Sequence, residues 1–457
     1  MIIIKKVLLI TTSFLMLCCF GSSNHESTNN HSSNHSLNEK KDIPVFNDSI
    51  PLLIMRSFLN PVENISKNSL KKLISNGSVY CTTDVLEEIK SKWNFNGVIP
   101  VSIKNYNKAN DSTFLITSLD SVDYSLLATN YNEKNFFKSP DKYDFWIKSS
   151  PPFSYESQIT KYTHTGVTAL TRRTGLFLDK NSTDYYLENI IPYFQNSDIT
   201  HISNEVSLVD DCDYSTMRLK FATKKEHFDA INKINTTIVE LTGNHNLDFG
   251  KPAYLNSLEW YKKNNISYFG GGKSPKDANR PLVKFLKDST KVAWIGFNEY
   301  CPLNECADTY MGANRYSESK AKILIDSLKT QSVDVLIACV QFGETDSYSP
   351  TSSQKRICKK LIDLGADVIY GSQAHQPQEI ALYKNKLIFY GLGNFMFDQI
   401  HRLGVRQAFF LECYFYKNKL IQCQPVYTFM ASNRQPTIAS ETEKKAIRKV
   451  ILKSTNF

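Results

Sequence analysis

Short apolar runs alternate with amphipathic helical segments from about Ser154 to the end of the chain. The predicted strands are 159–167, 198–203, 236–243, 291–298, 334–342, 366–372 and 386–394. The predicted helices between them are 183–195, 224–234, 252–264, 318–330 and 353–365. Two antiparallel strands, which need no helix between them, are then predicted at 405–416 and 420–430. This alternation predicts a layered α/β domain with a mixed sheet over residues 154–457.

The preceding residues, 42–153, contain short strand-like and helical segments but no recognisable chemical motif. Apolar runs at 98–103 and 112–119 and a helical stretch at 85–93 predict a small α/β domain of unknown role. The segment 138–153 contains two prolines near its end and is the predicted boundary. A chain of 457 residues is long enough for two such domains.

The N-terminus has the pattern of an export signal. Lys5 and Lys6 precede the apolar run 7–20. This run is too short for a resident transmembrane helix and suits the apolar region of a signal peptide. Residues 1–19 are therefore predicted to be a signal peptide.

Two cysteines at the end of the apolar run suggest a lipid anchor. Cys19, or alternatively Cys18, stands where bacterial lipoproteins are acylated, although an ordinary cleaved signal remains the other interpretation. Residues 20–41 are rich in Ser, Asn and His and are predicted to be a disordered tether. We therefore expect an exported lipoprotein of the bacterial cell envelope that contacts the membrane through its anchor.

Export makes disulfides permissible among the ten cysteines. Cys301 and Cys306 flank a short loop, and Cys413 and Cys423 lie symmetrically in a predicted hairpin. Each pair can form a disulfide or consist of two simply packed thiols, and the sequence leaves both interpretations open.

The net charge of +9 is spread along the chain. No basic stripe or tail of the kind that binds nucleic acid is present in the sequence, so we expect no nucleic-acid partner. The surplus is compatible with an anionic partner, and a solvated surface is the alternative explanation.

Polar residues follow the predicted strands where ligands bind in open α/β sheets, at the carboxyl ends. Carboxylate, amide and imidazole groups can ligate a divalent metal or transfer protons. Asn and Gly are also ordinary turn residues, and a single histidine is often only structural. The polar residues at these ends are Asn204, Glu205, Asn244, His245, Asp248, Gln341, Glu344, Ser372, Gln373, His375, Asn394 and Asp398.

Three segments that contain most of these strand-end residues together resemble the capsule-biosynthesis family of CapA type, which is associated with poly-gamma-glutamate. They are 197–208, 242–250 and 342–399, and the resemblance extends over about residues 155–430. It implies a layered mixed-sheet domain similar to calcineurin-like metallophosphoesterases, preceded by the small α/β domain.

The metal-binding pattern that the resemblance implies is incomplete in this chain. Val167 stands where the family has an aspartate, although Gly166 and Arg172 beside it are kept. Gln341 replaces a histidine, and in the segment 371–375 only His375 remains of the family's histidines. We therefore expect one divalent metal site at most, or none.

The resemblance also implies roles for the residues that remain. Glu205, Asn244 and His375 would ligate the metal, His245 would be the general acid, and Glu344 would be a second carboxylate. The implied function is synthesis or export of a capsule or poly-gamma-glutamate-type polymer, in one interpretation with metal-dependent hydrolysis. The alternative is a non-catalytic lipoprotein that binds a polymer or a solute. The expected partner is an anionic polymer or a cell-wall component.

Overall fold

The computed structural model describes residues 47–453, except 104, 107–111, 123, 132–134, 139–145 and 303. The predicted signal peptide and tether, with Cys18 and Cys19, lie outside the described residues. Within the described part of the chain, no helix is long and apolar enough to cross a membrane.

The first sheet has seven strands in the order β2-β6-β1-β5-β3-β4, and β7 also pairs with β1. The strands are β1 (Asn47–Arg56), β2 (Asn64–Ile65), β3 (Val79–Thr82), β4 (Ile99–Val101), β5 (Phe114–Ser118), β6 (Leu127–Tyr131) and β7 (Trp146–Phe153), with helices α1 (Lys67–Ser75) and α2 (Leu86–Trp93). Strand β5 pairs antiparallel with β1 and parallel with β3, so this sheet is mixed. The predicted elements at 85–93, 98–103 and 112–119 are confirmed. A domain boundary after Phe153 stays a prediction.

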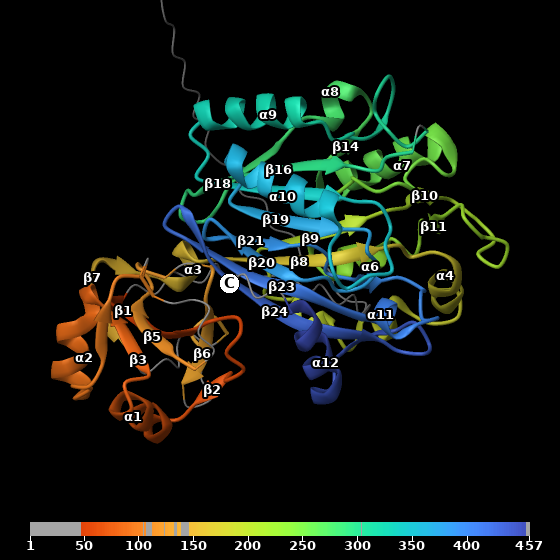
Figure 1. Ribbon diagram of the computed structural model, residues 1–457. Helices are drawn as coiled ribbons and strands as arrows, with labels where there is room; N and C mark the ends of the chain where they lie inside the picture. Colours follow the sequence, from red (N-terminus) through yellow and green to blue (C-terminus); the bar gives the residue numbers. More distant parts are fainter. Residues whose placement is uncertain are drawn as a thin grey trace, which may run out of the picture. The chain divides into compact units, whose positions relative to one another are not determined.

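The second sheet has eight strands in the order β13-β12-β9-β8-β23-β24-β25, with β22 paired to β8. Its neighbouring strands β9, β8, β23 and β24 are labelled in Figure 1. Its strands are β8 (Thr160–Thr168), β9 (Ile199–Asn204), β12 (Thr236–Glu240), β13 (Ser267–Phe269), β22 (Asn394–Met396), β23 (Gln407–Tyr416), β24 (Lys419–Met430) and β25 (Pro436–Ile438). Strands β8, β9, β12 and β13 are parallel, whereas β23 is antiparallel to both β8 and β24. The predicted antiparallel close of the chain is confirmed.

The third sheet has six strands in the order β15-β16-β18-β19-β21-β20. They are β15 (Leu282–Phe285), β16 (Lys291–Asn298), β18 (Val335–Gln341), β19 (Val368–Ser372), β20 (Ile380–Tyr383) and β21 (Lys386–Phe389). Two small sheets join β10 (Ser207–Val209) to β11 (Ala222–Lys224) and β14 (Gly271–Gly272) to β17 (Gly312–Ala313). The predicted strands thus divide between two mixed sheets.

Side-chain alternation explains how the second and third sheets pack. Along β18, Ile337 and Cys339 join an apolar cluster with residues of the second sheet, such as Tyr162 and Leu411. The intervening Ala338 joins the cluster formed with helices α9 (Glu318–Thr330) and α10 (Ser352–Leu364). Because successive strand residues point to opposite faces, one face of the third sheet packs on the second sheet and the other on helices.

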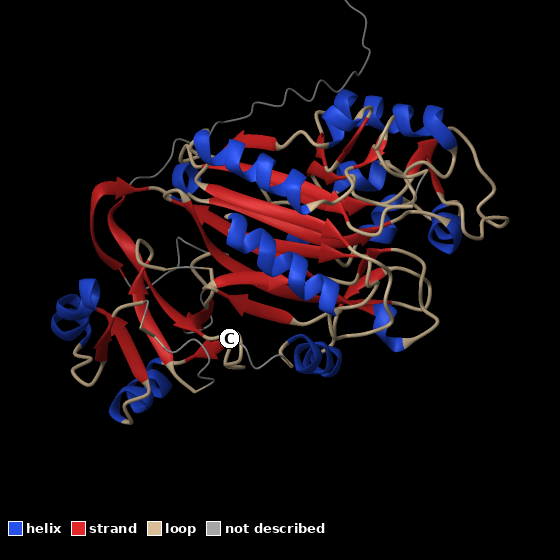
Figure 2. Ribbon diagram, turned by 45° about the horizontal axis from the view of Figure 1, so that its top comes forward, coloured by secondary structure: helices blue, strands red, loops and turns tan. Residues whose placement is uncertain are grey.

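The helices of this region lie along the sheets (Figure 2). They are α3 (Tyr155–Gln158), α4 (Arg172–Leu178), α5 (Thr183–Leu187), α6 (Asp229–Lys233), α7 (Gly250–Lys263), α8 (Pro275–Ala278), α9 (Glu318–Thr330), α10 (Ser352–Leu364), α11 (Leu403–Arg406) and α12 (Glu441–Ile451). Helix α10 begins with a capping box formed by Thr351 and Gln354 and ends at Gly365, whose φ is 126°.

One predicted helix is interrupted for a local reason. The segment 183–195 forms α5 and then a short 3-10 turn, Ile191–Tyr193, which has a proline in its first turn. Pro192 has no backbone N–H to continue an α-helix and is tolerated only near a helix start.

The two predicted cysteine pairs have different outcomes. Cys301 and Cys306 form a disulfide. Cys413 and Cys423 lie opposite each other on β23 and β24, as the hairpin predicted, with sulfur atoms 3.1 Å apart, but both are free thiols.

Candidate functional site

Gln341, the last residue of β18, contacts two of the predicted site residues, Glu205 and Asn244. Its amide nitrogen lies 2.7 Å from Asn244 Oδ1, 2.6 Å from Gln373 Oε1 and 3.4 Å from Glu205 Oε1. These acceptors follow β12, β19 and β9, so carboxyl ends from both sheets converge here. The amide has two N–H groups and can donate to two of the three acceptors at once.

Glu205 is fully buried at this point of convergence. Its backbone N–H donates to Thr168 O at 3.1 Å, which holds it beside the end of β8. Its Oε2 atom has no hydrogen-bond partner among the described residues. Burial raises the pKa of the Glu205 carboxyl, and the nearby His375 and His245 act in the opposite direction. A buried carboxylate oxygen without a donor is costly unless a proton or a cation reaches it.

His375 has one ring nitrogen committed and one available. Nδ1 lies 2.9 Å from Asn394 Oδ1, while the Asn394 amide nitrogen donates to Val405 O at 3.1 Å. Since that amide is oriented by its own donation, His375 Nδ1 carries the proton and Nε2 is free to ligate. Nε2 lies 3.9 Å from Oε1 of Glu344, whose side chain is 65% exposed. Glu344 therefore lies at the solvent-facing side of the site.

His245 is oriented by a carboxylate. Its Nδ1 lies 2.7 Å from Asp248 Oδ2, and the same oxygen accepts the Phe221 N–H at 2.8 Å. Burial acts to lower the pKa of His245, but the Asp248 hydrogen bond and the nearby Glu205 carboxylate outweigh it, and the net pKa is raised. A raised pKa and a fixed ring suit His245 to hold a proton for a leaving group.

The donor set offers ligands for one cation at most, and Asn244 Oδ1 also accepts from the Gln341 amide. Glu205 Oε2 and Gln341 Oε1 are buried without partners in the described structure, and Asn244 and His375 lie beside them. At the position of the family's missing aspartate, Val167 is 1% exposed and packs in an apolar cluster. That cluster offers no ligand for a second metal.

Sequence reasoning missed Glu305 and the pairing of Arg172. Glu305 is 6% exposed, and its Oε2 accepts the Leu247 N–H at 2.7 Å. It lies in the loop closed by the Cys301 disulfide and belongs to no motif. Arg172, at φ 48°, pairs with Asp398 and stacks on Phe221, with 4.5 Å between guanidinium carbon and ring centroid. The spacing from Arg172 to Asp398, 226 residues, gives no local signal for this pair.

The Arg172–Asp398 pair also lines a basic cavity of about 780 Å³. Asp398 is its one carboxylate, and no ion pair joins Arg173, Arg218 or Arg434 to a carboxylate in the described structure. Burial and the charge of Arg173 lower the pKa of Arg434. The positive charges of Arg173 and Arg434 therefore lie close together. The full lining is Arg172, Arg173, Leu176, Tyr214, Ser215, Met217, Arg218, Asp398, Gln399, Ile400, His401 and Arg434. The cavity is therefore suited to an anion.

Comparison with known families gives the assignment. The model of the bacterial capsule synthesis protein PGA_cap family matches residues 157–399, just over half of the chain. The chain belongs to this family. The match contains all three segments on which the resemblance rests, 197–208, 242–250 and 342–399. It confirms the resemblance to CapA-type proteins.

Two curated relatives show the extent of the likeness. The chain is 26% identical to capsule biosynthesis protein CapA of Bacillus anthracis, over 53% of this chain and 61% of the relative. It is 23% identical to PGA biosynthesis protein CapA of Bacillus subtilis, over 54% of this chain and 65% of that protein. The matched region thus spans less than two thirds of either relative.

Similar solved structures include two phosphoesterases. The calcineurin-like phosphoesterase YfkN from Bacillus subtilis is 15% identical with a TM-score of 0.34, over 64% of this chain and 96% of YfkN. A 5'-nucleotidase precursor from Thermus thermophilus is 13% identical with a TM-score of 0.34, over 64% of this chain and 58% of that one. TM-scores of this size carry no argument about activity. The layered α/β fold with mixed sheets is confirmed by the strand pairings themselves.

Proposed function

We propose that this chain acts in the synthesis or export of an anionic cell-envelope polymer of the capsule or poly-gamma-glutamate type, and that it binds the polymer directly. The observation that carries the proposal is the basic cavity beside the strand-end site. Its three arginines without a carboxylate partner in the described structure, Arg173, Arg218 and Arg434, can each form paired hydrogen bonds to a carboxylate.

The strand-end site and the basic cavity meet at the Arg172–Asp398 pair. Arg172 stacks on Phe221, whose ring in turn lies 4.2 Å from the His245 ring, centroid to centroid. A polymer segment held by Arg173 and Arg218 would therefore pass close to His245. Repeated carboxylates along the polymer suit a site in which several cations line one cavity.

Hydrolysis is the proposed chemistry at the strand ends. Glu205, Asn244 and His375 would hold one divalent cation, which when bound polarises a carbonyl or phosphoryl oxygen. His245 holds a proton, oriented by Asp248, for the leaving group. Glu344, at the solvent-facing side, is the proposed second carboxylate.

The proposed place of action is the cell envelope. The apolar run 7–20 and the cysteines that end it support export and lipid anchoring at Cys19 or Cys18. A lipid anchor would hold the polymer-binding region at the membrane surface, where a growing anionic polymer emerges.

Charge reversal in the cavity tests polymer binding. The double variant Arg173→Glu/Arg218→Glu is expected to bind a poly-γ-glutamate oligomer at least about 10-fold more weakly, because charge-assisted hydrogen bonds contribute roughly 1.5–3 kcal/mol each. Isothermal titration calorimetry at low and high salt measures the change. Lys276→Glu, an exposed lysine on α8, is the matched control and should bind like the wild type. Equal affinity in the double variant and the control contradicts polymer binding at this cavity.

Removing His245 tests hydrolysis separately. His245→Ala is expected to lower the release of fragments from the same oligomer about 100-fold or more, since general acids contribute roughly 10²–10⁴-fold, while binding is retained. Chromatography of the products with added Mn²⁺ measures it. If the wild type binds the oligomer but releases no fragments, the non-catalytic binding function replaces hydrolysis. The donation of Gln341 into the proposed metal ligands is the reason for measuring fragment release and binding separately.

A further inference from the structure

A second group of potential ligands lies inside the protein, between the second and third sheets. His201 on β9, Glu240 on β12 and Cys339 on β18 each offer one ligand atom, and these atoms all lie within 4.8 Å of one another. All three residues are at most 2% exposed. Alternation along the strands places Glu240 on the same face as Ile238, which belongs to the apolar layer between the sheets. Burying three polar side chains in an apolar layer costs free energy unless they bind one another or a ligand.

The hydrogen bonds around this group leave one ring nitrogen without a partner in the described structure. His201 Nδ1 lies 2.7 Å from the Tyr162 hydroxyl and 2.9 Å from His164 Nδ1. The hydroxyl of Thr242 donates to Glu240 Oε1. His201 Nε2 has no hydrogen-bond partner in the described structure, and it lies 3.7 Å from Glu240 Oε2. A fully buried imidazole nitrogen without a hydrogen-bond partner thus lies near the Glu240 carboxylate, which the Cys339 thiol also contacts through a hydrogen bond.

These distances are those of ligands around a small ion. Two ligand atoms at about 2.0–2.2 Å from a tetrahedral Zn²⁺ are separated by roughly 3.3–3.6 Å. The 3.7 Å separation of His201 Nε2 and Glu240 Oε2 is close to that value. The Tyr162 hydroxyl can accept the Nδ1 proton of His201, as the outer partners of metal-bound histidines do.

We propose that His201, Glu240 and Cys339 bind one transition-metal ion of the Zn²⁺ class inside the protein, at a site separate from Glu205, Asn244 and His375. A thiolate, an imidazole and a carboxylate are ligands of such ions, whereas Mg²⁺ and Ca²⁺ prefer oxygen alone. This inference does not depend on the proposed function.

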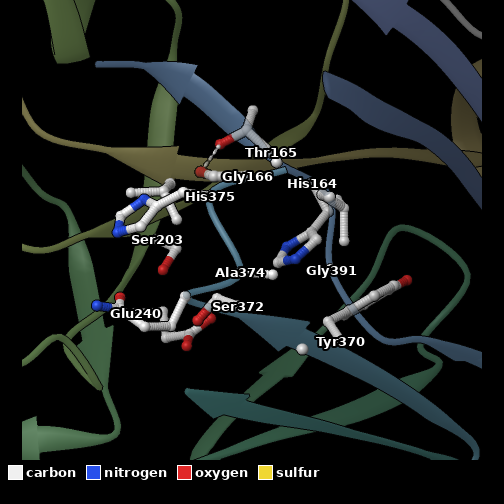
Figure 3. Close-up of a pocket in the computed structure, with 15 residues that line it drawn as sticks. His164, Thr165, Gly166, Ser203, Glu240, Tyr370, Ser372, Ala374, His375 and Gly391 are labelled. Atoms are coloured by element: carbon white, nitrogen blue, oxygen red, sulfur yellow. Dashed lines mark hydrogen bonds between the residues drawn. The ribbon is translucent and has the colours of Figure 1, made fainter. Parts of the chain in front are cut away.

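A small cavity adjoins Glu240, one of the three proposed ligands. It encloses about 10 Å³, the space of about one water molecule, and Glu240, Ser203 and His375 are among the residues that line it (Figure 3). Ser203 Oγ is buried without a hydrogen-bond partner in the described part of the chain. A water bound to the metal could donate to Ser203. Because His375 lines the same cavity, the cavity also borders the strand-end site.

The charges of the proposed ligands suit a divalent ion. A thiol must lose its proton to ligate, so binding of the ion would displace the Cys339 proton to solvent and leave Glu240 as a carboxylate. The charges of ion, thiolate and carboxylate then sum to zero, which removes the cost of an unpaired buried charge.

Cobalt substitution tests the site, because only a thiolate ligand gives Co²⁺ a sulfur-to-metal charge-transfer band in the near ultraviolet. The full chain is produced with Co²⁺ in the medium, so that the buried site is loaded during folding. We expect one equivalent of Co²⁺ that shows this band. The band is expected to disappear in Cys339→Ser and Cys339→Ala and to persist in Cys212→Ser, which changes a partly exposed free cysteine. His375→Ala should also keep the band, since His375 is not one of the proposed ligands.

Several results would overturn the proposal. They are a wild-type protein without the band, a band that survives in folded Cys339→Ser, and a band that is lost in Cys212→Ser. If the Cys339 variants do not fold, His201→Gln decides, because a band of unchanged position and intensity in that variant also overturns the site.

Discussion

Replacing Gly166 by alanine is expected to lower the free energy of unfolding by about 3 kcal/mol or more, because it forces two backbone segments apart. A Cβ at Gly166 would lie 2.0 Å from the carbonyl oxygen of Gly393 and 3.4 Å from the Cβ of Leu392. The same Gly393 carbonyl accepts the Val167 N–H at 3.0 Å. The added Cβ would therefore clash with a hydrogen-bonded backbone oxygen, which cannot move away by rotating as a side-chain atom could.

Urea denaturation followed by circular dichroism measures this change, and Gly343→Ala is its matched control. At Gly343 the nearest atom to an added Cβ is Tyr300 Cδ2 at 3.8 Å, an ordinary contact. We expect a change within about 0.5 kcal/mol for the control. A Gly166→Ala variant as stable as the control would show that β8 and β22 can separate without cost. The site depends on this approach, since Asn394, which orients His375, pairs with Val167 on β8.

Replacing Glu305 by glutamine is expected to stabilise the protein at pH 8 and to flatten its stability between about pH 4.5 and 8. Burial raises the pKa of Glu305 to about 8, and the charge of Asp248 acts in the same direction. The folded state thus binds this proton more tightly than the unfolded state. The stability it contributes is complete below the unfolded pKa and is lost as pH rises through about 8.

The size of the effect follows from the pKa difference. One pKa unit corresponds to about 1.4 kcal/mol, so we expect a gain of roughly 2–5 kcal/mol for Glu305→Gln at pH 8 and little change at pH 5. Glutamine keeps an acceptor oxygen for the Leu247 N–H. Urea denaturation at pH 5, 6, 7 and 8 gives the profile, with Glu259→Gln on the exposed face of α7 as control. Parallel profiles for the two variants would rule out an uncharged Glu305 in the folded protein.

Local patterns in the sequence were sufficient for most elements of the second and third sheets. The predicted bounds 291–298 and 318–330 are those of β16 and α9. Helix α9 buries Ala321, Ile325 and Leu328 on one face and begins at a Ser317 cap, features that lie within one segment and can be read directly. The division of the strands between two sheets depends on which strands pair, and no single segment encodes that choice.

The candidate site likewise combines residues that the sequence indicates with contacts that only the folded chain provides. Glu205, Asn244, His245 and His375 were found because each follows a strand, and the carboxyl ends of parallel strands lie at one edge. The Gln341 amide that contacts Glu205 and Asn244, and the orienting pair of His375 with Asn394, required the folded chain.

The sequence by itself determined the strand-and-helix alternation, the family and the residues at the strand ends, because each of these is a property of neighbouring residues. Only the tertiary structure decided which distant groups share an environment. It brings Glu305 to Leu247, Arg172 to Asp398, and His201 to Glu240 and Cys339. The physical reason is that burial and electrostatic coupling depend on distance in space, and strands from two sheets bring together side chains that are far apart along the chain.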